Sequence, residues 1–294
     1  ECCYQMKELV EKKDMEYSLF DELDPEQKEI NDKYTIDELF KRSLNYKSSK
    51  NYAKFFNFIA SFHHYSRYNT MLVYIQNPDV TFFGGTTFWK NRNRTINEDA
   101  KPLLILCPNG PMMCAYDIYQ TSGKKSVDEF LKDGLGTTDI KGFINQKLYD
   151  GLLKEVANWG IKIKFKPFSF FKGGHITTII SGRLEIVLKE NATITESFSV
   201  LIHELAHLFL GHTGHQSLNH ISQKKNMKLL SRKIPRATEE LEAETVSFLI
   251  CCRVGLLSNS QEYLAGYIKD EKDLADFNYE LVIKTADKLE KLFL

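Results

Sequence analysis

The chain has 294 residues, and its 39 lysines and arginines are balanced by 39 aspartates and glutamates, so the formal net charge at pH 7 is zero. A chain of this length can form two ordinary domains, each with its own core. Because the charges balance, the net charge alone does not indicate what the protein binds. No apolar run is long enough to cross a membrane.

Charge is unevenly distributed near the N-terminus. Residues 1–40 carry thirteen acidic and five basic side chains, a net charge of −8, whereas residues 41–101 carry three acidic and ten basic ones, a net charge of +7. Adjacent blocks of opposite charge are typical of an acidic extension that precedes a basic surface. Residues 1–44 are therefore expected to form a helical, acidic extension.

The cysteines predict the redox environment. None of the six lies in a CxxC spacing, and the two adjacent pairs, at residues 2–3 and 251–252, are poorly placed to bridge each other. We therefore expect reduced cysteines. No signal-peptide pattern is evident either. Together these features predict a cytoplasmic protein.

Hydrophobic spacing divides the rest of the chain into helical and strand-forming segments. Helices are predicted at residues 51–76, 145–158, 238–254 and 273–294. Short strands are predicted at residues 80–83, 102–107, 112–119 and 161–165, with an Asn109-Gly110 turn before the third. Residues 175–180 and 183–189 are expected to pair as a hairpin around Ser181-Gly182. The predicted fold is α+β, with a mixed α/β domain at 45–125, a glycine-containing linker at 126–145 and a second domain at 146–294.

The most informative motif is His203-Glu204-Leu205-Ala206-His207. On an α-helix, residues i and i+4 share one face, so both imidazoles can bind one metal ion, with Glu204 beside it as a general base. Thr193, Thr195 or Ser197 can cap the start of such a helix, and Gly211 can end it in the left-handed conformation. An apolar stripe suits a buried helix: Val200, Leu201, Leu205, Leu208 and Phe209. The motif predicts a zinc-hydrolase helix.

A catalytic zinc ion needs a third protein ligand. His212, His215 and His220 follow the helix and are weaker candidates, because they lie beyond Gly211. Glu240 and Glu244 are better placed, since they share one face of the next helix. Glu240 is assigned as the ligand and Glu244 as the hydrogen-bond acceptor of a ligand imidazole. The alternative for this acidic run, above all for Glu239 and Glu242, is a solvated helix start.

The chemistry predicted for this motif is zinc-dependent hydrolysis of a peptide bond. Zinc lowers the pKa of a water molecule and polarises the scissile carbonyl, while Glu204 takes and returns the proton. His212, His215 and Tyr263 are unranked candidates for the oxyanion donor. The strand at residues 183–189 is the candidate edge for an extended substrate, with an ordinary internal strand as the alternative.

With these residues in place, two resemblances become specific. The C-terminal half resembles the ImmA/IrrE-type zincin-like metallopeptidases, in HELAHLFLGH at 203–212 and in ExxAE followed by an apolar helix at 240–244. In that family the histidine pair and a glutamate of the next helix bind zinc, which implies Glu240 as the ligand and Glu204 as the catalytic residue.

The N-terminal half resembles the ArdC-type antirestriction proteins, which place a single-stranded-DNA-binding domain ahead of such a peptidase. The matching runs, in the same order, are residues 66–72, 76–78, 88–89, 101–102, 105–108 and 116–121. The two resemblances together cover about residues 45–265. The chain departs from the pattern in the long basic stretch at residues 221–236, for which a lid, a second nucleic-acid contact and a solvated loop are the alternatives.

Single-strand binding needs cations along the nucleic-acid backbone and aromatic faces on which bases stack. Residues 62–94 interleave both, and the asparagines beside Arg92 and Arg94 suggest a turn that presents these two cations to phosphates. Most of the aromatic residues are expected in the core. With the resemblance, the predicted nucleic-acid contacts are Arg67, Tyr68, Asn69, Trp89, Lys90, Arg92 and Arg94.

Three functions follow as hypotheses. The first is a zinc metalloendopeptidase joined to a single-stranded-DNA-binding domain, for which the resemblance implies antirestriction or mobile-element biology. The second is an ImmA-like regulatory peptidase that cleaves a repressor protein. The third is a non-enzymatic antirestriction decoy that binds DNA and holds zinc structurally. The expected partners are single-stranded DNA and a protein or peptide substrate, without a membrane.

Overall fold

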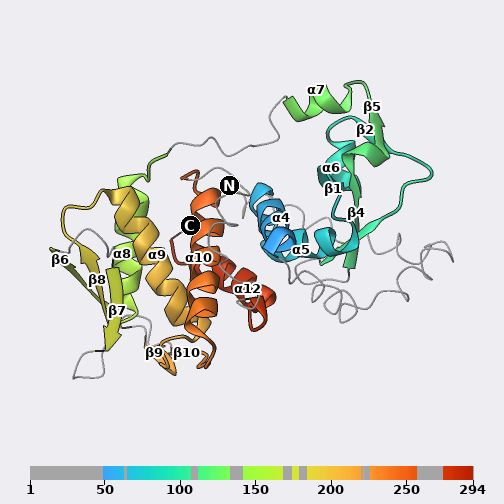
Figure 1. Cartoon of the computed structure of the whole chain (residues 1–294). Coiled ribbons are helices and arrows are strands. Elements are labelled where there is room, and N and C mark those ends of the chain that lie inside the picture. Colours follow the sequence, from blue (N-terminus) through green and yellow to red (C-terminus); the bar gives the residue numbers. More distant parts are fainter. Residues whose placement is uncertain are drawn as a thin grey trace. The chain divides into compact units, whose positions relative to one another are not determined.

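A computed structural model describes residues 49–62, 65–106, 112–132, 142–167, 174–178, 184–219, 221, 226–256 and 274–293 (Figure 1). The chain divides into two compact units, Glu1–Asn45 and Tyr46–Leu294, and all of the described residues belong to the second. The predicted acidic extension, the turns at 109–110 and 181–182, His220 and Tyr263 lie outside the described residues.

The first part of the described unit contains two helices and an antiparallel sheet. The predicted helical stretch 51–76 forms two helices, α4 (Ser49–Ser61) and α5 (Arg67–Gln76). The sheet has the order β1-β4-β3, with β1 at Phe83–Gly85, β3 at Leu103–Leu106 and β4 at Met112–Asp117. The first strand therefore begins three residues later than predicted. A core of mostly aromatic and branched side chains joins helices and sheet: Phe62, Val73, Val80, Phe83, Leu103, Ile105 and Ala115.

Two amides of α5 extend this sheet at the outer edge of β3. Asn69 accepts the Leu106 N–H and donates to the Leu106 carbonyl, both at 2.9 Å. Gln76 makes the same pair of bonds with Leu104, both at 2.8 Å. Because backbone groups at a sheet edge need partners, these side chains take the place of a further strand.

A second small lobe follows the first strand. Helix α6 (Thr86–Lys90) leads into β2 (Arg94–Ile96), which pairs with β5 (Thr121–Gly123) beyond the 3₁₀ turn η2 (Ile118–Gln120). Helix α7 (Val127–Lys132) lies in the stretch predicted as linker. Trp89, Ile118 and Phe130 form the core of this lobe, and the indole N–H of Trp89 donates to the Tyr116 carbonyl at 3.0 Å.

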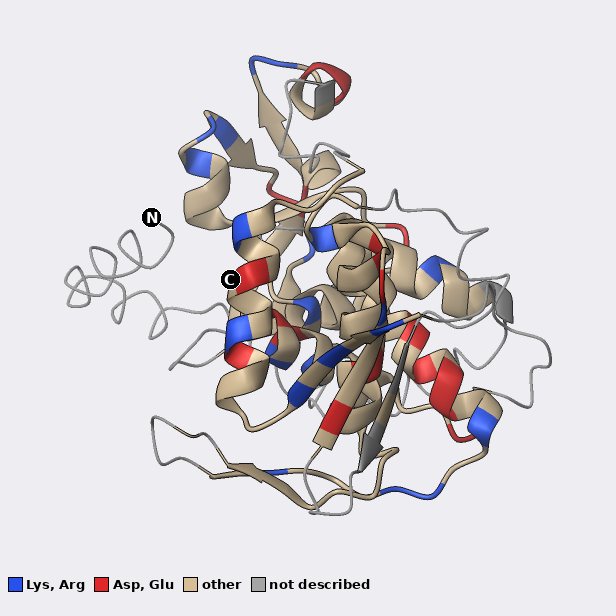
Figure 2. Ribbon diagram, turned by 90° about the vertical axis from the view of Figure 1, so that its left-hand side faces the viewer, with Lys and Arg blue, Asp and Glu red and all other residues tan. Residues whose placement is uncertain are grey.

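The second part begins with α8 (Gln146–Asn158), which is capped by the side chain of Asn145, and a three-stranded sheet. Its strands are β6 (Lys162–Lys166), β7 (Gly174–Thr178) and β8 (Leu184–Lys189), in the order β6-β8-β7. The predicted hairpin is confirmed, because β7 pairs with β8 antiparallel. Lysines occupy every second position of β6, at residues 162, 164 and 166 (Lys and Arg are blue in Figure 2). Lys164 forms an ion pair with Glu185 at 2.7 Å.

The strand order corrects one prediction. Residues 183–189 were the candidate edge strand, with an ordinary internal strand as the alternative. The alternative holds, because β8 is the central strand, parallel to β6 on one side and antiparallel to β7 on the other. Its side chains from Leu184 to Leu188 are accordingly buried. Within the described residues, β7 is the edge strand that contacts the following helix, α9 (Ile194–Leu210).

Three helices complete the unit. α9 packs against α10 (Arg236–Arg253), and both pack against α12 (Tyr279–Glu290). A short hairpin of β9 (Ser217–Asn219) and β10 (Asn226–Lys228) lies between α9 and α10 in the chain. None of the described helices combines the length and the apolarity that crossing a bilayer requires.

The contacts cross the boundary predicted at residues 126–145. Helix α4 packs against α10, and α5 packs against α12. The hydroxyls of Tyr52 and Thr245 form a buried hydrogen bond. Arg67 of α5 pairs with Asp287 at 2.6 Å and with Glu290, and it also donates to the Leu249 carbonyl. The first two helices are thus built into the same helical layer as α9 and α10.

Candidate metal centre

Local sequence signals set both ends of α9. Thr193 caps the first turn and forms a reciprocal capping box with Glu196. Gly211 ends the helix with φ of 86°, the left-handed conformation that glycine adopts without strain. A side chain at Gly211 would also meet the Leu230 backbone at 2.8 Å. The predicted cap and stop are confirmed, and between them the helix presents His203, Glu204 and His207.

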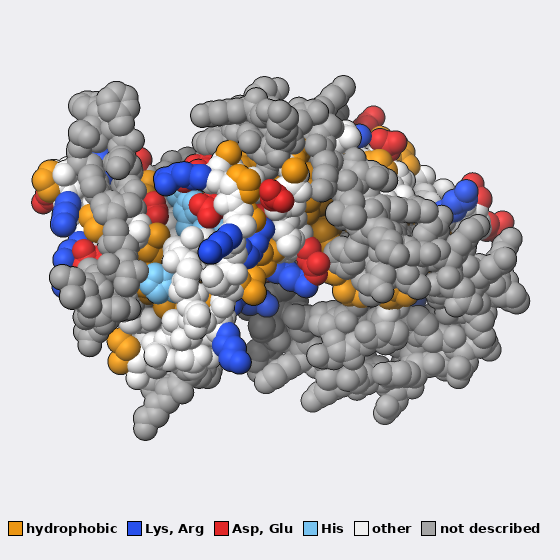
Figure 3. Space-filling model, turned by 60° about the horizontal axis from the view of Figure 1, so that its bottom comes forward, with side chains coloured by type: hydrophobic (Ala, Val, Ile, Leu, Met, Phe, Trp, Pro, Cys, Tyr) orange, Lys and Arg blue, Asp and Glu red, His pale blue; other side chains and the backbone are white. Residues whose placement is uncertain are grey.

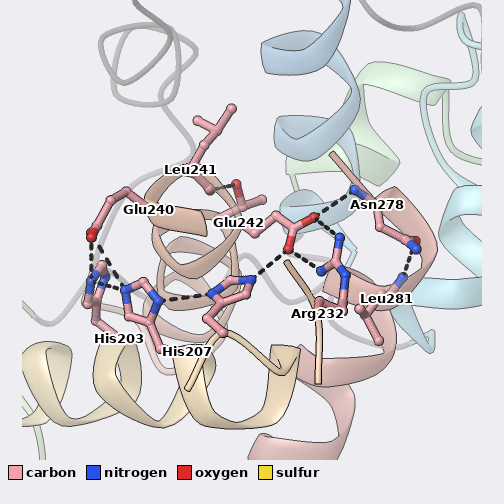
Figure 4. Close-up of polar contacts among 10 residues, drawn as sticks. His203, His207, Arg232, Glu240, Leu241, Glu242, Asn278 and Leu281 are labelled. Atoms are coloured by element: carbon pink, nitrogen blue, oxygen red, sulfur yellow. Dashed lines mark hydrogen bonds and ion pairs between the residues drawn. The ribbon is translucent and has the colours of Figure 1, made fainter. Parts of the chain in front are cut away.

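The three predicted metal ligands meet at one point. The Nε2 atoms of His203 and His207 are 3.1 Å apart, and Oε2 of Glu240 lies 3.5 Å from the first and 3.6 Å from the second (Figure 4). Ligand atoms about 2.0–2.1 Å from a tetrahedral ion would lie about 3.3–3.4 Å from one another. Two imidazoles and a carboxylate therefore sit at the spacing that one tetrahedral metal ion requires.

The site is open on one side. The side chains of His203 and His207 are 19% and 13% exposed, and that of Glu240 is 44% exposed. Figure 3 shows histidine side chains reaching the surface beside acidic and basic ones. Among the described residues, these three form the only cluster of metal-binding side chains with the right spacing. An open side is what distinguishes a catalytic metal site from a closed structural one.

Glu244 lies on the same face of α10, one turn beyond Glu240. Its Oε1 is 3.4 Å from Nδ1 of His203, and the chain thus places this carboxylate behind the ligand imidazole, where the sequence predicts it. The buried Nδ1 makes no hydrogen bond of good geometry within the described part of the chain. Glu244 is half-buried, and the loss of solvation raises its pKa, although His203 acts in the opposite direction.

Glu204 lies in the interior beside the two imidazoles. Its side chain is 8% exposed and accepts a hydrogen bond from the backbone N–H of Ile176 on β7. Burial raises the pKa of this carboxyl, although His203 and His207 act in the opposite direction. A carboxylate with a raised pKa is a stronger base than an exposed one, which suits it to accept a proton.

The electrostatics of the site favour a positive charge. Burial lowers the pKa of His203, but the neighbouring carboxylates Glu240, Glu244 and Glu204 outweigh burial, so the pKa is raised. The proximity of both imidazoles lowers the pKa of Glu240 well below its usual range. A proton on the imidazoles or a metal cation between the donors satisfies this arrangement, because either one neutralises the gathered carboxylates.

A buried carboxylate, that of Glu242, lies on α10 beside the candidate metal centre with hydrogen-bond donors from three other segments. A solvated helix start was the alternative given for Glu242, but its side chain is fully buried. It receives hydrogen bonds from His212 at 3.0 Å, from both terminal nitrogens of Arg232 and from the Asn278 N–H at 2.8 Å (Figure 4). Burial raises the pKa of Glu242, but these donors outweigh it and the pKa is lowered.

A signal for the burial of Glu242 was present in the sequence. Residues 242, 246 and 249 lie on one face of α10, and the last two are the apolar Val246 and Leu249. An acid at an apolar position of a helix indicates a buried, paired carboxylate. The arginine partner explains part of the basic stretch 221–236, since Arg232 turns inward and its backbone N–H donates to the Gly211 carbonyl at 2.9 Å.

Four of the seven predicted nucleic-acid contacts make their contacts within the fold: three are buried, and the amide of the fourth is bonded to β3. Arg67, Trp89 and Arg94 are 2%, 0% and 5% exposed. Arg67 pairs with the acids of α12, and Arg94 donates to Thr121 and to the Lys125 carbonyl. Both ends of the Asn69 amide are bonded to β3. These groups hold the fold together, which corrects the prediction that they contact nucleic acid.

The other three predicted contacts lie at or near the surface. Lys90 and Arg92 are exposed at the turn between α6 and β2, where Asn93 has φ of 56°. The guanidinium of Arg92 stacks over Phe88, 3.7 Å from the ring centre. Tyr68 is partly buried on α5, with the ammonium of Lys284 5.7 Å from its ring centre. Of the seven predicted contacts, Lys90 and Arg92 are thus the two cations that face solvent.

Comparison with known proteins finds two similarities. No family model matches the chain. An uncharacterized protein of Bacillus anthracis is 22% identical over 306 aligned residues, which cover 87% of this chain and 49% of that protein, so the chain spans about half the length of this relative. The crystal structure of the Mn(II)-bound antirestriction ArdC protein from plasmid R388 has a TM-score of 0.36 and 16% identity, over 76% of this chain and 84% of that chain. At these values neither similarity assigns the chain to a family.

Proposed function

We propose that the chain is a metal-dependent peptidase, with its metal ion held by His203, His207 and Glu240. The observation that carries the proposal is the triangle of donor atoms, with edges of 3.1, 3.5 and 3.6 Å, on the open side of a buried helix. Two imidazoles and one carboxylate, with a fourth direction left to solvent, are the donor set of catalytic zinc sites. Zinc is therefore the proposed ion.

The metal ion would supply Lewis acidity, which polarises a carbonyl and lowers the pKa of a water molecule. The protein side of the chemistry belongs to Glu204. Its carboxylate is buried next to both imidazoles, and one of its oxygens is already fixed by the Ile176 N–H. Glu204 is thereby oriented to accept a proton from the attacking water and to return it to the leaving amine.

The substrate proposed is an extended peptide segment. β7 is the strand that touches both α9 and the catalytic carboxylate, and within the described residues its outer edge carries no further strand. A peptide added alongside β7 would satisfy its backbone groups by strand addition and would pass the metal site. This replaces residues 183–189 as the expected edge, because those residues are internal.

The test is Glu204→Gln, assayed for zinc content and for cleavage of a mixed peptide library. The variant should keep one zinc ion per chain and lose peptide cleavage by about 10²–10⁴-fold, the usual effect of a positioned proton acceptor. Glu190→Gln, an exposed glutamate before the same helix, is the matched control and should cleave like the parent. Cleavage by Glu204→Gln at the parent rate would refute the assigned role.

A second candidate function is binding of single-stranded nucleic acid by the other end of the unit. What supports it is the pair of exposed cations Lys90 and Arg92 on a tight turn, with Phe88 stacked beneath the guanidinium. Cations next to an aromatic face are the elements of single-strand binding. The resemblance described above implies that such binding serves antirestriction or a mobile element.

A further inference from the structure

A chain of hydrogen bonds leads from a fully buried carboxylate to one of the two ligand imidazoles. Oε2 of Glu242 lies 3.0 Å from Nε2 of His212, and Nδ1 of His212 lies 2.9 Å from Nδ1 of His207. The far nitrogen of His207, Nε2, is the atom that faces His203 and Glu240. We propose that Glu242 and His212 are positioning residues that fix the tautomer and orientation of His207, an inference that rests on the proposed metal site.

The direction of the bonds follows from the chemistry of the groups. A carboxylate only accepts, so the bond to Glu242 places the His212 proton on Nε2. A neutral imidazole then has its lone pair on Nδ1, which accepts the Nδ1–H of His207. His207 is left with its lone pair on Nε2, at the point where the three donors meet. With both rings neutral, each carries one proton, and this is the assignment that satisfies both bonds.

Three separate elements hold the far end of this chain of hydrogen bonds in place. Glu242 comes from α10, and Arg232 binds both of its oxygens from the segment after β10. The Asn278 N–H, at the start of α12, donates to Oε1. The side chains of His212 and Glu242 are 2% and 0% exposed, so solvent does not compete for these bonds. A buried carboxylate is tolerated only when such donors compensate its desolvation.

The arrangement differs from that of the other imidazole. Nδ1 of His203 is 3.4 Å from Glu244 and lacks a well-formed bond in the described structure. Packing alone does not explain why a charged residue occupies position 242, since the next two positions along that face of α10, Val246 and Leu249, are apolar. The bonds from Glu242 end at a metal-binding nitrogen, and outer groups of this kind set ligand orientation and basicity.

The first test is the tautomer of His207 in the metal-free protein. Long-range proton–nitrogen NMR spectra of the ¹⁵N-histidine-labelled full chain distinguish Nδ1–H from Nε2–H imidazoles, and a His207→Gln spectrum assigns the signal. We expect Nδ1–H for His207 in the parent and a shift toward Nε2–H in His212→Phe. An Nε2–H signal in the parent would overturn the relay without any variant being needed.

The second test is zinc affinity. His212→Phe should lower it at least tenfold, as removal of outer-shell partners typically does. His212→Gln should restore it to within a few-fold, because a glutamine amide can donate to Glu242 and accept from His207. Gln216→Leu, at an exposed position of the same segment, is the control and should bind like the parent. If the parent binds no zinc, the proposed function fails; if it binds zinc and His212→Phe binds equally well, the relay alone fails.

Discussion

Both terminal nitrogens of the Arg232 guanidinium donate hydrogen bonds to the carboxylate of Glu242, with Nη1 at 2.5 Å from Oε2 and Nη2 at 3.0 Å from Oε1. Ten residues separate the two in sequence, and α10 begins between them. The pairing ties the segment after β10 to the helix that carries Glu240 and Glu244. Arg232 thus supports the helix that carries the proposed ligand Glu240 without contacting any of the three proposed ligands that would hold the ion.

Replacing Arg232 with alanine should destabilise the fold and leave Glu242 buried without its strongest donor. Removal of one partner of a buried ion pair costs about 3–5 kcal/mol, and the 18% exposure of Arg232 places the expected loss near the lower end. Urea unfolding of the metal-free protein measures it. Arg236→Ala is the control, since Arg236 is 87% exposed and should change stability by less than about 1 kcal/mol. Equal effects of the two substitutions would contradict the buried pairing.

Zinc affinity should fall as the pH falls. Zinc binding displaces the proton of His203, whose pKa the neighbouring carboxylates raise above 6.5 despite burial. The decline should therefore begin above pH 6.5. The stability of the metal-free protein should depend on pH in the opposite direction. A group whose pKa is raised by folding stabilises the folded state below its unfolded pKa, and this stabilisation is lost as the pH rises through its folded pKa.

Calorimetric zinc titrations in two buffers of different ionisation enthalpy count the protons released. More protons should be released near pH 6.5 than near pH 8. Glu244→Gln removes one of the charges that raise the pKa of His203 and should move the decline to lower pH. An affinity independent of pH over this range would show that His203 carries no proton to displace.

Replacing Lys90 and Arg92 together with alanine should weaken binding of a single-stranded oligonucleotide and flatten its salt dependence. Each lost phosphate contact lowers the slope of log K against log salt by about 0.7 for a single strand. Fluorescence anisotropy from low to moderate salt measures both quantities. Lys154→Ala, an exposed lysine of α8, is the control. Identical slopes for the double variant and the parent would place nucleic-acid binding elsewhere.

Local signals were sufficient to predict the metal-binding helix. A capping threonine, an apolar stripe, the histidine pair and Gly211 all act within one helix, so their spacing alone determines where it begins, ends and faces. Glu240 was accessible to the same reasoning, because the helix period places it beside Glu244. The α+β class also followed from the alternation of strand and helix patterns.

Contacts between segments that are distant in the sequence could not be predicted from such local patterns. His212 and Glu242 are 30 residues apart, and Arg67 meets Asp287 across 220 residues. A cation such as Arg67 gives no local sign that its partner lies inside the protein. The position of β8 in the centre of its sheet is likewise a property of strand order, which residue patterns within one strand do not encode.

Zinc titration of the parent and of Glu240→Ala shows whether His203, His207 and Glu240 hold one metal ion. The parent should bind one zinc ion per chain, and Glu240→Ala should bind it at least tenfold more weakly, because a direct ligand is lost and outer partners alone contribute that much. Glu239→Ala, its neighbour on the same helix, should leave the affinity unchanged. A parent that binds no zinc, or equal affinity in Glu240→Ala, would contradict the assignment of the site.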